Sequence, residues 1–589
     1  MNQAASASSW LDRLIAGWRG YALIALIALA GALPGVASLP VLDRDEARFA
    51  QASRQMIETG DYVRIRVQDT DRNKKPIGIH WLQAGATLAA QPAAHSLNAI
   101  WTYRIPSVLG VVLAALATFW AGQALIGRRA AFLGAALLAG SMMLGVEGMI
   151  AKTDGALAGV TTLAMAALAW LYAKPGGENQ RGLALCFWIT FGIGVLIKGP
   201  ITPMVSGLTI LALGLWTRDW RWLKPLARPL GPILAVLIVA PWMIAIGLAT
   251  HGQFFVEAIG GDLAPKMAGG QEGHFAWPGT HLLLLPALIF PAALALPAAA
   301  RLGWRAACKP DSENAAALRF LLAWAVPTFL AFELLPTKLA HYTLPAYPAI
   351  ALLCGAGLVA AAKERWRWTM ALGVALFALA GALLIALTAY AVTLMPGDAA
   401  ADARRATQAG LLGGVLFLGC LAGLALWRAP LARTALALIA ALSISWSLRE
   451  RILPEARTVL ISAELSRALH RADLSPNDDR ALWVYGYRET SLAFMTRTDI
   501  RMPGTLDVSQ IAPGDTVIVD AEEREEIANR LAARDLAFTP IGSDVRGRNY
   551  GNGSNVDLAI GVATPISAGP IDRASTPDAS PNAAPADGQ

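Results

Sequence analysis

The chain has 589 residues, of which 55% are hydrophobic and 15% are charged. Soluble globular chains carry roughly 25% charged residues, so the composition excludes an ordinary soluble protein and favours one embedded in a membrane. The formal net charge is +7. No basic stripe interleaved with aromatic residues lies on a polar segment, and this excludes a typical nucleic-acid-binding module.

Long apolar runs account for the low share of charged residues. The runs Tyr21–Leu39, Leu230–Leu248 and Thr369–Leu394 approach or exceed the roughly 20 residues that span the hydrocarbon core of a bilayer. Lipid offers the backbone no hydrogen-bond partners, so such runs must be helices. In chain order we expect about thirteen membrane helices, near residues 17–38, 104–124, 130–146, 154–173, 183–198, 200–216, 229–250, 281–300, 319–335, 343–361, 369–395, 409–427 and 431–449.

Basic residues in alternate loops indicate the orientation of these helices. Positive charges collect on the cytoplasmic loops of membrane proteins, and here they precede the first helix and recur in every second loop. The expected cytoplasmic loops contain Arg128/Arg129, Lys174/Arg181, Arg218/Arg221/Lys224/Arg228, Arg301/Arg305/Lys309, Lys363/Arg365/Arg367 and Arg428/Arg433. The long loops 40–103 and 251–280 and the C-terminal residues are then expected on the opposite side.

The C-terminal part has a different pattern. Strand-like runs at Ala481–Tyr487, Thr516–Asp520 and Val556–Val562 flank a helical pattern at Ala521–Arg534, which is typical of a small α/β domain. We therefore divide the chain into a membrane domain at 1–449, an extracytoplasmic α/β domain at 450–563 and a tail at 564–589. The tail is rich in Pro, Ala, Ser and Asp, and we expect it to be disordered.

The first candidate site follows the first membrane helix, at Asp43-Arg44-Asp45-Glu46-Ala47-Arg48. A carboxylate that emerges from a membrane helix can accept a proton from a hydroxyl group or bind a divalent cation. The alternative is a solvated start of an amphipathic helix, where acidic residues are favoured at the N-terminus.

Two further candidate sites are basic. Arg64, Arg66, Arg72, Lys74 and Lys75 precede a proline turn, and such a cluster suits an anionic lipid head group or a nonspecific attraction to anionic membrane surfaces. Lys198 lies in Ile197-Lys198-Gly199-Pro200, where Gly-Pro breaks a long apolar stretch; the alternative there is a snorkelling side chain. Asp154, Lys338 and Tyr342 lie in turns assigned to the same face. Because charges near membrane depth mark function, we expect an extracytoplasmic active site.

Several motifs together resemble those of a known family. The chain resembles the aminoarabinose transferase of lipid A and the dolichyl-phosphate-mannose protein mannosyltransferases, which are membrane glycosyltransferases of the GT-C fold. The resemblance covers roughly residues 15–360. It rests on Asp45-Glu46-Ala47-Arg48-Phe49-Ala50, Gly60-Asp61-Tyr62-Val63, Asn73-Lys74-Lys75-Pro76 running to Trp81-Leu82, Arg104-Ile105-Pro106-Ser107, Asp154, Lys198-Gly199-Pro200, and Tyr342-Thr343-Leu344-Pro345 before Pro348.

The resemblance implies a sugar donor carried on a polyprenyl phosphate, with Asp45 as the catalytic carboxylate. The residues that it implies for the donor phosphate are Arg48, Lys75, Lys198, Lys338 and Tyr342. Sugar phosphates are already activated, so such an enzyme needs a base for the acceptor hydroxyl and cations for the departing phosphate. Further candidates for the site are Glu46, Arg104, Asp154, Asp262 and His274.

The chain also departs from the aminoarabinose transferase pattern. Lys74 stands where that family has an acidic metal ligand, and the histidine ligand after its seventh helix has no clear counterpart. The corresponding loop here contains Asp262, Glu272 and His274. The sequence therefore leaves open whether the site binds a divalent cation.

The sequence thus predicts a glycosyltransferase of a bacterial-type inner membrane, with its active site and C-terminus facing the periplasm. Its expected partners are a polyprenyl-phosphate sugar and an acceptor, which is lipid A, another envelope glycan or a protein hydroxyl. The alternative is a transporter or flippase of a lipid-linked substrate. That alternative predicts charges spread through the bilayer midplane and broken helices in two matching halves, whereas here the charges gather on one face.

Overall fold

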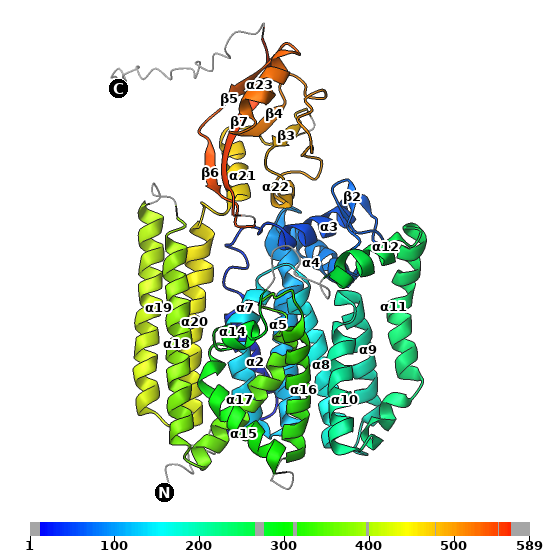
Figure 1. Ribbon diagram of the computed structural model, residues 1–589, viewed down its shortest axis with the longest axis vertical. Coiled ribbons are helices and arrows are strands. Elements are labelled where there is room, and N and C mark those ends of the chain that lie inside the picture. The colour runs from blue at the N-terminus through cyan, green and yellow to red at the C-terminus, as the bar shows by residue number, and fades with distance from the viewer. Residues whose placement is uncertain are drawn as a thin grey trace, which may run out of the picture. The chain divides into compact units, whose positions relative to one another are not determined.

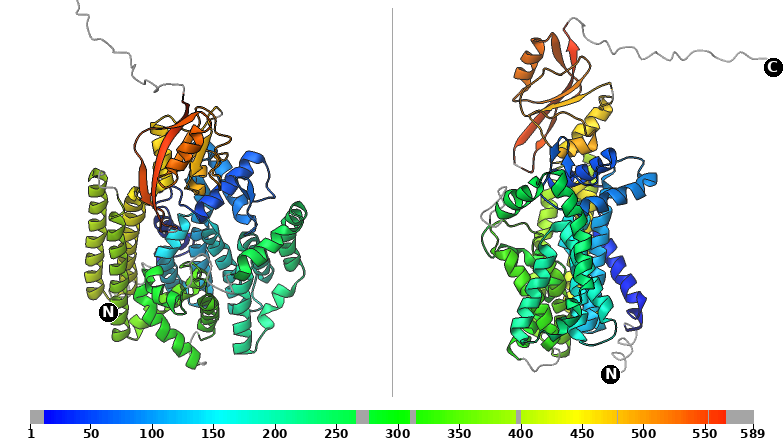
Figure 2. Two further views of the ribbon diagram at one scale, coloured as in Figure 1. Left: turned by 45° about the horizontal axis from the view of Figure 1, so that its top comes forward. Right: turned by 90° about the vertical axis from the view of Figure 1, so that its right-hand side faces the viewer.

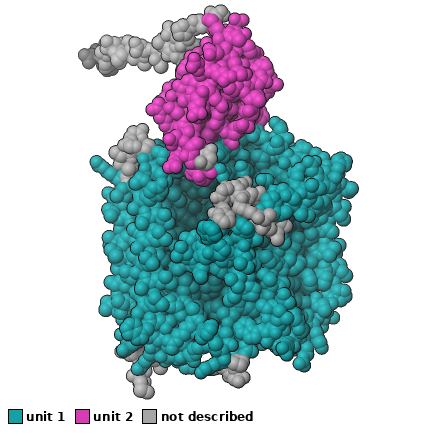
Figure 3. Space-filling model, viewed as in Figure 1, with its two compact units in different colours: residues 1–463, 489–498 teal, residues 464–488, 499–589 magenta. Residues whose placement is uncertain are grey.

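The computed structural model describes residues 12–265, 276–309, 315–395, 400–477, 479–551 and 553–566 (Figure 1). The chain divides into two compact units, which Figure 3 shows in different colours. One unit comprises residues 1–463 and 489–498, and the other comprises residues 464–488 and 499–589. The expected domain boundaries at residues 449 and 563 stay predictions, and most of the expected disordered tail lies outside the described residues.

The first unit is helical, and most of its helices run along a common direction (Figures 1 and 2). Its helices with membrane-like composition are α2 (Trp18–Ala32), α5 (Ile100–Leu125), α6 (Arg128–Ala139), α7 (Met142–Gly148), α8 (Thr153–Ala173), α9 (Gln180–Lys198), α10 (Ile201–Thr217), α11 (Leu230–Ala249), α14 (Thr280–Leu288), η3 (Ala292–Ala295), α15 (Leu296–Cys308), α16 (Ala315–Leu334), α17 (Tyr347–Lys363), α18 (Arg367–Val392), α19 (Ala400–Leu426) and α20 (Pro430–Trp446).

All thirteen expected spans coincide with apolar helices, but not all are single long helices. Among the described residues, nine helices are long and apolar enough to cross a membrane, and the count is eleven if each bent pair is one span. The bent pairs are α6 with α7, at 57°, and α14 with η3 and α15, at 111°. The two remaining expected spans are the shorter apolar helices α2 and α10. The all-helical membrane fold is thereby confirmed.

Small residues bring the central helices α5 and α8 into close contact. A Cβ atom at Gly110 of α5 would lie 2.3 Å from the Gly155 carbonyl oxygen of α8, and one at Gly159 would lie 2.4 Å from the Gly110 carbonyl oxygen. Only glycine allows this approach, as is typical of packed membrane helices. Because α8 begins at Thr153, this packing fixes the position of Asp154 in its first turn.

The loop between α2 and α5 carries short elements at one end of the helical unit (Figure 1). They are α3 (Asp45–Thr59), β1 (Arg66–Val67), β2 (Thr70–Asp71) and α4 (Gly78–Ala94). The remaining short elements of this unit are η1 (Arg221–Ala227), α12 (Gln253–Val256), η2 (Glu257–Leu263), η4 (Leu344–Ala346), η5 (Ser447–Ile452), η6 (Leu453–Glu455) and α22 (Thr490–Met495).

The second unit is built on a five-stranded sheet with the strand order β3-β4-β7-β5, and β6 also pairs with β7. β3 and β4 are parallel, and the other pairs are antiparallel. Its elements are β3 (Leu482–Tyr485), β4 (Thr516–Asp520), α23 (Arg524–Ala532), β5 (Leu536–Pro540), β6 (Val545–Arg548) and β7 (Asn555–Pro565), and α21 (Ile461–Arg471) leads into it. The prediction of a small α/β fold in this region is confirmed.

Candidate active site

A polar cavity of about 250 Å³ lies where the loops after α2, α7, α9 and α16 meet. Most of its lining side chains are charged. The polar and charged ones are Asp43, Arg44, Asp45, Arg48, Arg72, Lys74, Lys75, Lys152, Thr153, Asp154, Lys198, Thr337, His341 and Tyr342. Cations therefore outnumber carboxylates, and the cavity suits an anionic ligand.

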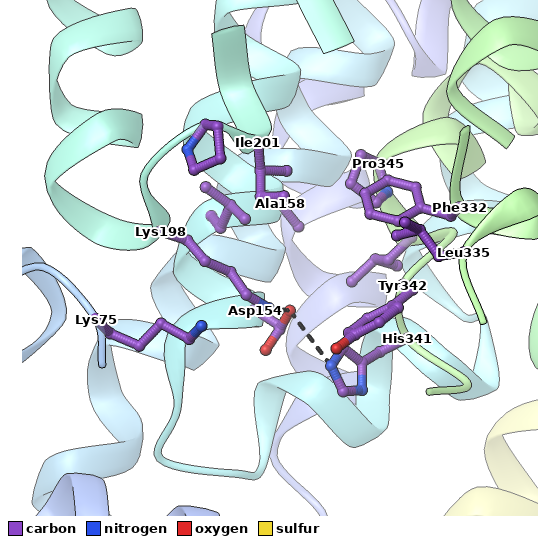
Figure 4. Close-up of a pocket in the computed structure, with 13 residues that line it drawn as sticks. Lys75, Asp154, Ala158, Lys198, Ile201, Phe332, Leu335, His341, Tyr342 and Pro345 are labelled. Carbon is purple, nitrogen blue, oxygen red and sulfur yellow. Dashed lines mark hydrogen bonds and ion pairs between the residues drawn. The ribbon is translucent and has the colours of Figure 1, made fainter. Parts of the chain in front are cut away.

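An apolar cavity of about 120 Å³ shares part of this lining (Figure 4). Its remaining walls are mostly apolar side chains of α8, α10, α16 and η4. The residues that line both cavities are Lys75, Asp154, Lys198, His341 and Tyr342. A ligand with an anionic group at these five residues can thus place an apolar group in one cavity and a polar group in the other.

The Gly-Pro break positions Lys198. Helix α9 ends at Lys198, and Gly199 has a φ of 60°, which favours glycine. Pro200 then begins the turn into α10, as expected for a helix-breaking residue. The Lys198 ammonium lies 2.5 Å from a carboxylate oxygen of Asp154 and 5.8 Å from the centre of the Tyr342 ring.

His341 and Lys152 extend this ion pair into a buried network. His341 Nε2 lies 3.6 Å from Asp154, and its Nδ1 lies 3.3 Å from the Lys152 ammonium. Lys152 in turn lies 3.1 Å from a carboxylate oxygen of Glu147. Burial lowers the pKa of His341 well below its usual range, although Asp154 opposes this shift. Burial thus favours the neutral ring, whose Nδ1 can accept a hydrogen bond from the Lys152 ammonium.

Asp45 is the most exposed carboxylate of the site, with 62% of its side chain accessible. It begins α3 and lies 3.6 Å from the guanidinium of Arg72. Arg72 also lies over the Phe49 ring, 4.9 Å from its centre. Arg48 follows on α3 and lines the same cavity. An accessible carboxylate beside several cations can accept a proton from a bound hydroxyl group.

Asp43 lines the same cavity but is buried. It accepts hydrogen bonds from the hydroxyl groups of Ser491 and Ser462. Burial raises the pKa of Asp43 to about 6, and the serine hydroxyls oppose this shift. Ser491 lies on α22, in the segment 489–498 that belongs to the helical unit. This segment therefore holds a carboxylate of the cavity wall through a hydrogen bond.

Two other sequence-predicted residues, Glu46 and Arg104, form a buried bidentate ion pair with distances of 2.8 and 2.9 Å. Arg104 also donates to the backbone carbonyls of Val36 and Leu39, and Glu46 accepts from the backbone N–H of Ala151. Neither side chain lines the two cavities. The pair connects the loop after α2 with the loop before α8, so these two residues stabilise the loops that surround the site.

Lys338 also points away from the cavities. Its ammonium donates to the backbone carbonyls of Glu333 and Leu335 at the end of α16. Asp262 lies in η2, and His274 lies outside the described residues. Within the described parts of the chain no group of three or more His, Cys, Asp or Glu side chains can hold a metal ion.

The sequence-predicted residues that the structure brings together are Asp45, Arg48, Lys75, Asp154, Lys198 and Tyr342. The sequence placed Asp43 and Arg72 only within candidate segments, and it assigned no role to them, to Lys152 or to His341. Each of these lies within two or three residues of a predicted one or in the same basic cluster, so the local charge pattern was their only sequence signal.

Comparison with known proteins shows what the chain is similar to. Residues 87–253 match the family of dolichyl-phosphate-mannose-protein mannosyltransferases. An undecaprenyl phosphate-alpha-4-amino-4-deoxy-L-arabinose arabinosyl transferase of Erwinia tasmaniensis is 30% identical over 315 residues, which are 52% of this chain and 54% of that protein. The protein of the same name from Pseudomonas paraeruginosa is 27% identical over 69% of this chain and 70% of its own length. The chain thus spans little more than half the length of the first curated relatives that it matches.

A solved structure shows the same fold over nearly the whole chain. The crystal structure of ArnT from Cupriavidus metallidurans bound to undecaprenyl phosphate superposes with a TM-score of 0.71. The two sequences are 18% identical, and the match covers 92% of this chain and 98% of that one. The chain is thus similar in sequence to these glycosyltransferases over part of its length, and it shares the multi-pass membrane fold of ArnT over nearly its whole length.

Proposed function

We propose that the chain transfers a sugar from a polyprenyl-phosphate carrier to an acceptor of the bacterial cell envelope. The observation that carries this proposal is the set of five residues shared by the charged and the apolar cavity. A polyprenyl-phosphate sugar has a phosphate between an apolar chain and a polar sugar, and this order matches the order of the two cavities.

The donor phosphate is best accommodated by Lys75 and Lys198 at the junction of the cavities, with Arg48 and Arg72 on the polar side. Cations in a partly enclosed site stabilise the negative charge that develops on a leaving phosphate. Lysine contacts phosphate as a point charge, whereas arginine can donate two parallel hydrogen bonds. Lys338, in this proposal, acts indirectly by holding the turn that carries His341 and Tyr342.

In the transfer step, the acceptor oxygen forms a bond to the anomeric carbon of the sugar. The bond between that carbon and the phosphate oxygen breaks, and the electron pair leaves with the phosphate. The proton of the acceptor hydroxyl moves to the Asp45 carboxylate, which is accessible from the polar cavity. Asp154 is already paired with Lys198 at 2.5 Å, so it orients that cation instead of serving as the base.

The relatives support the class of donor. The curated relatives are named as arabinosyl transferases of undecaprenyl phosphate-linked aminoarabinose, and the structural neighbour is bound to undecaprenyl phosphate. The positive-inside pattern supports a periplasmic position for the charged cavity, because the basic loops lie at the opposite ends of α8, α9, α10 and α11. The acceptor is an envelope glycolipid such as lipid A, another glycan or a protein hydroxyl.

Donor turnover by the purified protein in nanodiscs tests this proposal. Bacterial envelope lipids and a panel of undecaprenyl-phosphate sugars are supplied, and the undecaprenyl phosphate released is measured. We expect release by the unmodified protein, and a loss of at least about 100-fold in Asp45→Asn, as is usual when a general base is removed. Asp71→Asn is the matched control, because Asp71 lies in the same loop and pairs with Arg66 away from the cavities.

Equal turnover in Asp45→Asn and the control would exclude Asp45 as the general base. A protein that moves labelled carrier between the leaflets of vesicles but releases no sugar with any donor would instead be a flippase.

A further inference from the structure

A second charged pocket lies at the other end of the helical unit. Its volume is about 310 Å³, and it is formed by the turn between α8 and α9 and by η1, which connects α10 to α11. The cavities of the candidate active site lie at the start of α8 and the end of α9. The two sites are therefore separated by the full length of these helices, and the proposed transfer does not use this pocket.

Among the described residues, three cations line the pocket and no carboxylate does. They are Arg221, Lys224 and Arg228, all in or beside η1. Asp219, which does not line the pocket, lies 3.3 Å from Arg221. The pocket thus keeps a net positive potential and favours an anionic ligand.

Two buried polar atoms in the pocket wall lack a partner. The indole Nε1 of Trp222 and the side-chain oxygen Oε1 of Gln180 are buried, and neither has a hydrogen-bond partner among the described residues. Trp222 is only 6% exposed, and its ring is held edge-on against Tyr172, 5.3 Å away. Gln180 is fixed through its amide nitrogen, which donates to the Lys174 carbonyl. Buried tryptophan N–H groups usually have a partner, so this pocket offers one donor and one acceptor to a ligand.

The pocket lies at the level of the lipid head groups. The turn and η1 that form it connect the ends of the apolar helices α8, α9, α10 and α11, and the exposed Trp216 and Trp220 precede η1. Exposed tryptophans at helix ends mark the boundary between the hydrocarbon core and water. The Trp220 ring packs over Gly214 of α10, where a Cβ atom would lie 2.1 Å from it. A phospholipid of the adjacent leaflet can therefore reach the pocket with its head group.

We propose that this pocket binds the head group of an anionic phospholipid that carries a hydroxyl group, as phosphatidylglycerol does. The three cations and the Trp222 indole bind the phosphate, and Gln180 Oε1 accepts a hydrogen bond from the glycerol hydroxyl. Phosphatidylethanolamine binds more weakly, because its ammonium group enters a pocket lined by three cations. Basic pockets between membrane helices are a known way to hold anionic lipids.

Native mass spectrometry of the full-length protein, released from nanodiscs of dioleoyl-phosphatidylglycerol and dioleoyl-phosphatidylethanolamine, tests the proposal. The pocket variant is R221Q/K224Q/R228Q, and the matched control is K363Q/R365Q/R367Q, which removes the same charge from another basic loop. We expect the pocket variant to retain at least about tenfold less phosphatidylglycerol, since each cation near the membrane surface attracts the anionic head group. The control should retain as much as the unmodified protein.

Trp222→Phe provides a second readout, because it keeps all three cations and the ring packing. Loss of one hydrogen bond should weaken phosphatidylglycerol retention by about threefold without changing phosphatidylethanolamine. Equal losses in the pocket variant and the control would overturn the proposal, because they would reflect general attraction to an anionic bilayer. Unchanged retention in the pocket variant, or displacement of the lipid by millimolar inorganic phosphate, would overturn it as well.

Discussion

At the scale of single residues, Asp154 and Lys198 form an ion pair where the two cavities meet. Both side chains are largely buried and lie 2.5 Å apart. Removing one partner leaves a buried charge alone, which costs about 3–5 kcal/mol. The cation that we propose for the donor phosphate is therefore held in place by a carboxylate that does not contact the reacting atoms.

This pairing predicts strong coupling in a double-mutant cycle. Asp154→Asn and Lys198→Met should each lower the melting temperature and donor turnover. The double variant should be less destabilised than the sum of the two, by about 1–3 kcal/mol. The exposed pair Arg66–Asp71 is the control, and its coupling energy should stay below about 1 kcal/mol. Additive effects at Asp154 and Lys198 would contradict the buried pairing.

Asp43 makes the stability of the protein depend on pH. Burial raises the pKa of its carboxyl group from 3.8 to about 6, so the folded state binds more protons than the unfolded state between these values. The free energy of unfolding therefore falls as pH rises from about 4 to 6, by up to about 3 kcal/mol. Above pH 6 this loss is complete.

The matching measurement compares melting temperatures of the unmodified protein and Asp43→Asn from pH 4 to 7.5. The variant has no carboxyl group to ionise, so its melting temperature should fall less over this range. Ser491→Ala removes a hydroxyl group that donates to the ionised form, and it should move the transition to higher pH. Parallel curves for the unmodified protein and Asp43→Asn would show that Asp43 does not titrate in this range.

At the scale of elements, the segment 489–498 is packed against α3. Arg54 of α3 donates to the Phe494 carbonyl at 2.9 Å, and Phe494 lies edge-on against Tyr103, 5.3 Å away. Asn98 donates to the carbonyls of Met495 and Thr496. The segment thus joins the same unit as α3, the helix that begins with Asp45.

This packing predicts that Arg54 supports the active site indirectly. Arg54→Gln removes a charged donor to a buried carbonyl and should cost about 1–3 kcal/mol. Hydrogen exchange should then become faster in residues 490–498, and donor turnover should fall because Ser491 no longer holds Asp43. Arg66→Gln in the exposed hairpin is the control. Slower turnover without faster hydrogen exchange in residues 490–498 would contradict the prediction that Arg54 acts through this segment.

The close approach of α5 and α8 predicts opposite effects for two glycine substitutions. A Cβ atom at Gly110 would lie 2.3 Å from a backbone oxygen of α8, whereas a Cβ atom at Gly85 of α4 meets nothing within 4 Å. Gly110→Ala should therefore destabilise the protein by about 1–3 kcal/mol. Gly85→Ala should stabilise it by about 0.5–1 kcal/mol, because alanine favours a helix. Thermal unfolding in detergent distinguishes the two, and equal shifts would refute the packing argument.

At the scale of the whole molecule, the helices could be predicted because hydropathy is a local property of the sequence. All thirteen predicted spans correspond to apolar helices, including two that bend. Which side chains line the site was harder to predict from the sequence. Lys338 and His341 lie in the same turn, yet only His341 lines the cavities. The direction of a side chain depends on tertiary packing, which charge patterns do not report.

The pair of Glu46 and Arg104 illustrates the same limit. Both are charged and near membrane depth, which favours a functional role, but they are 58 positions apart in the sequence and meet as a buried brace. Asp45, one position before Glu46, points into the polar cavity instead. Adjacent carboxylates on one helix thus serve different purposes, because successive residues of a helix face different sides.

The lining shared by the two cavities also has a consequence for the kinetics of the proposed reaction. The spent carrier keeps the phosphate and the apolar chain of the donor, and it loses only the sugar. In the function that we propose, Lys75 and Lys198 bind the product as firmly as the substrate, and we expect release of the carrier to limit the rate. Added polyprenyl monophosphate should compete with the donor, and neutralising Lys75 should relieve this inhibition. The protein would then work at a rate set by how quickly the membrane removes and recycles its carrier lipid.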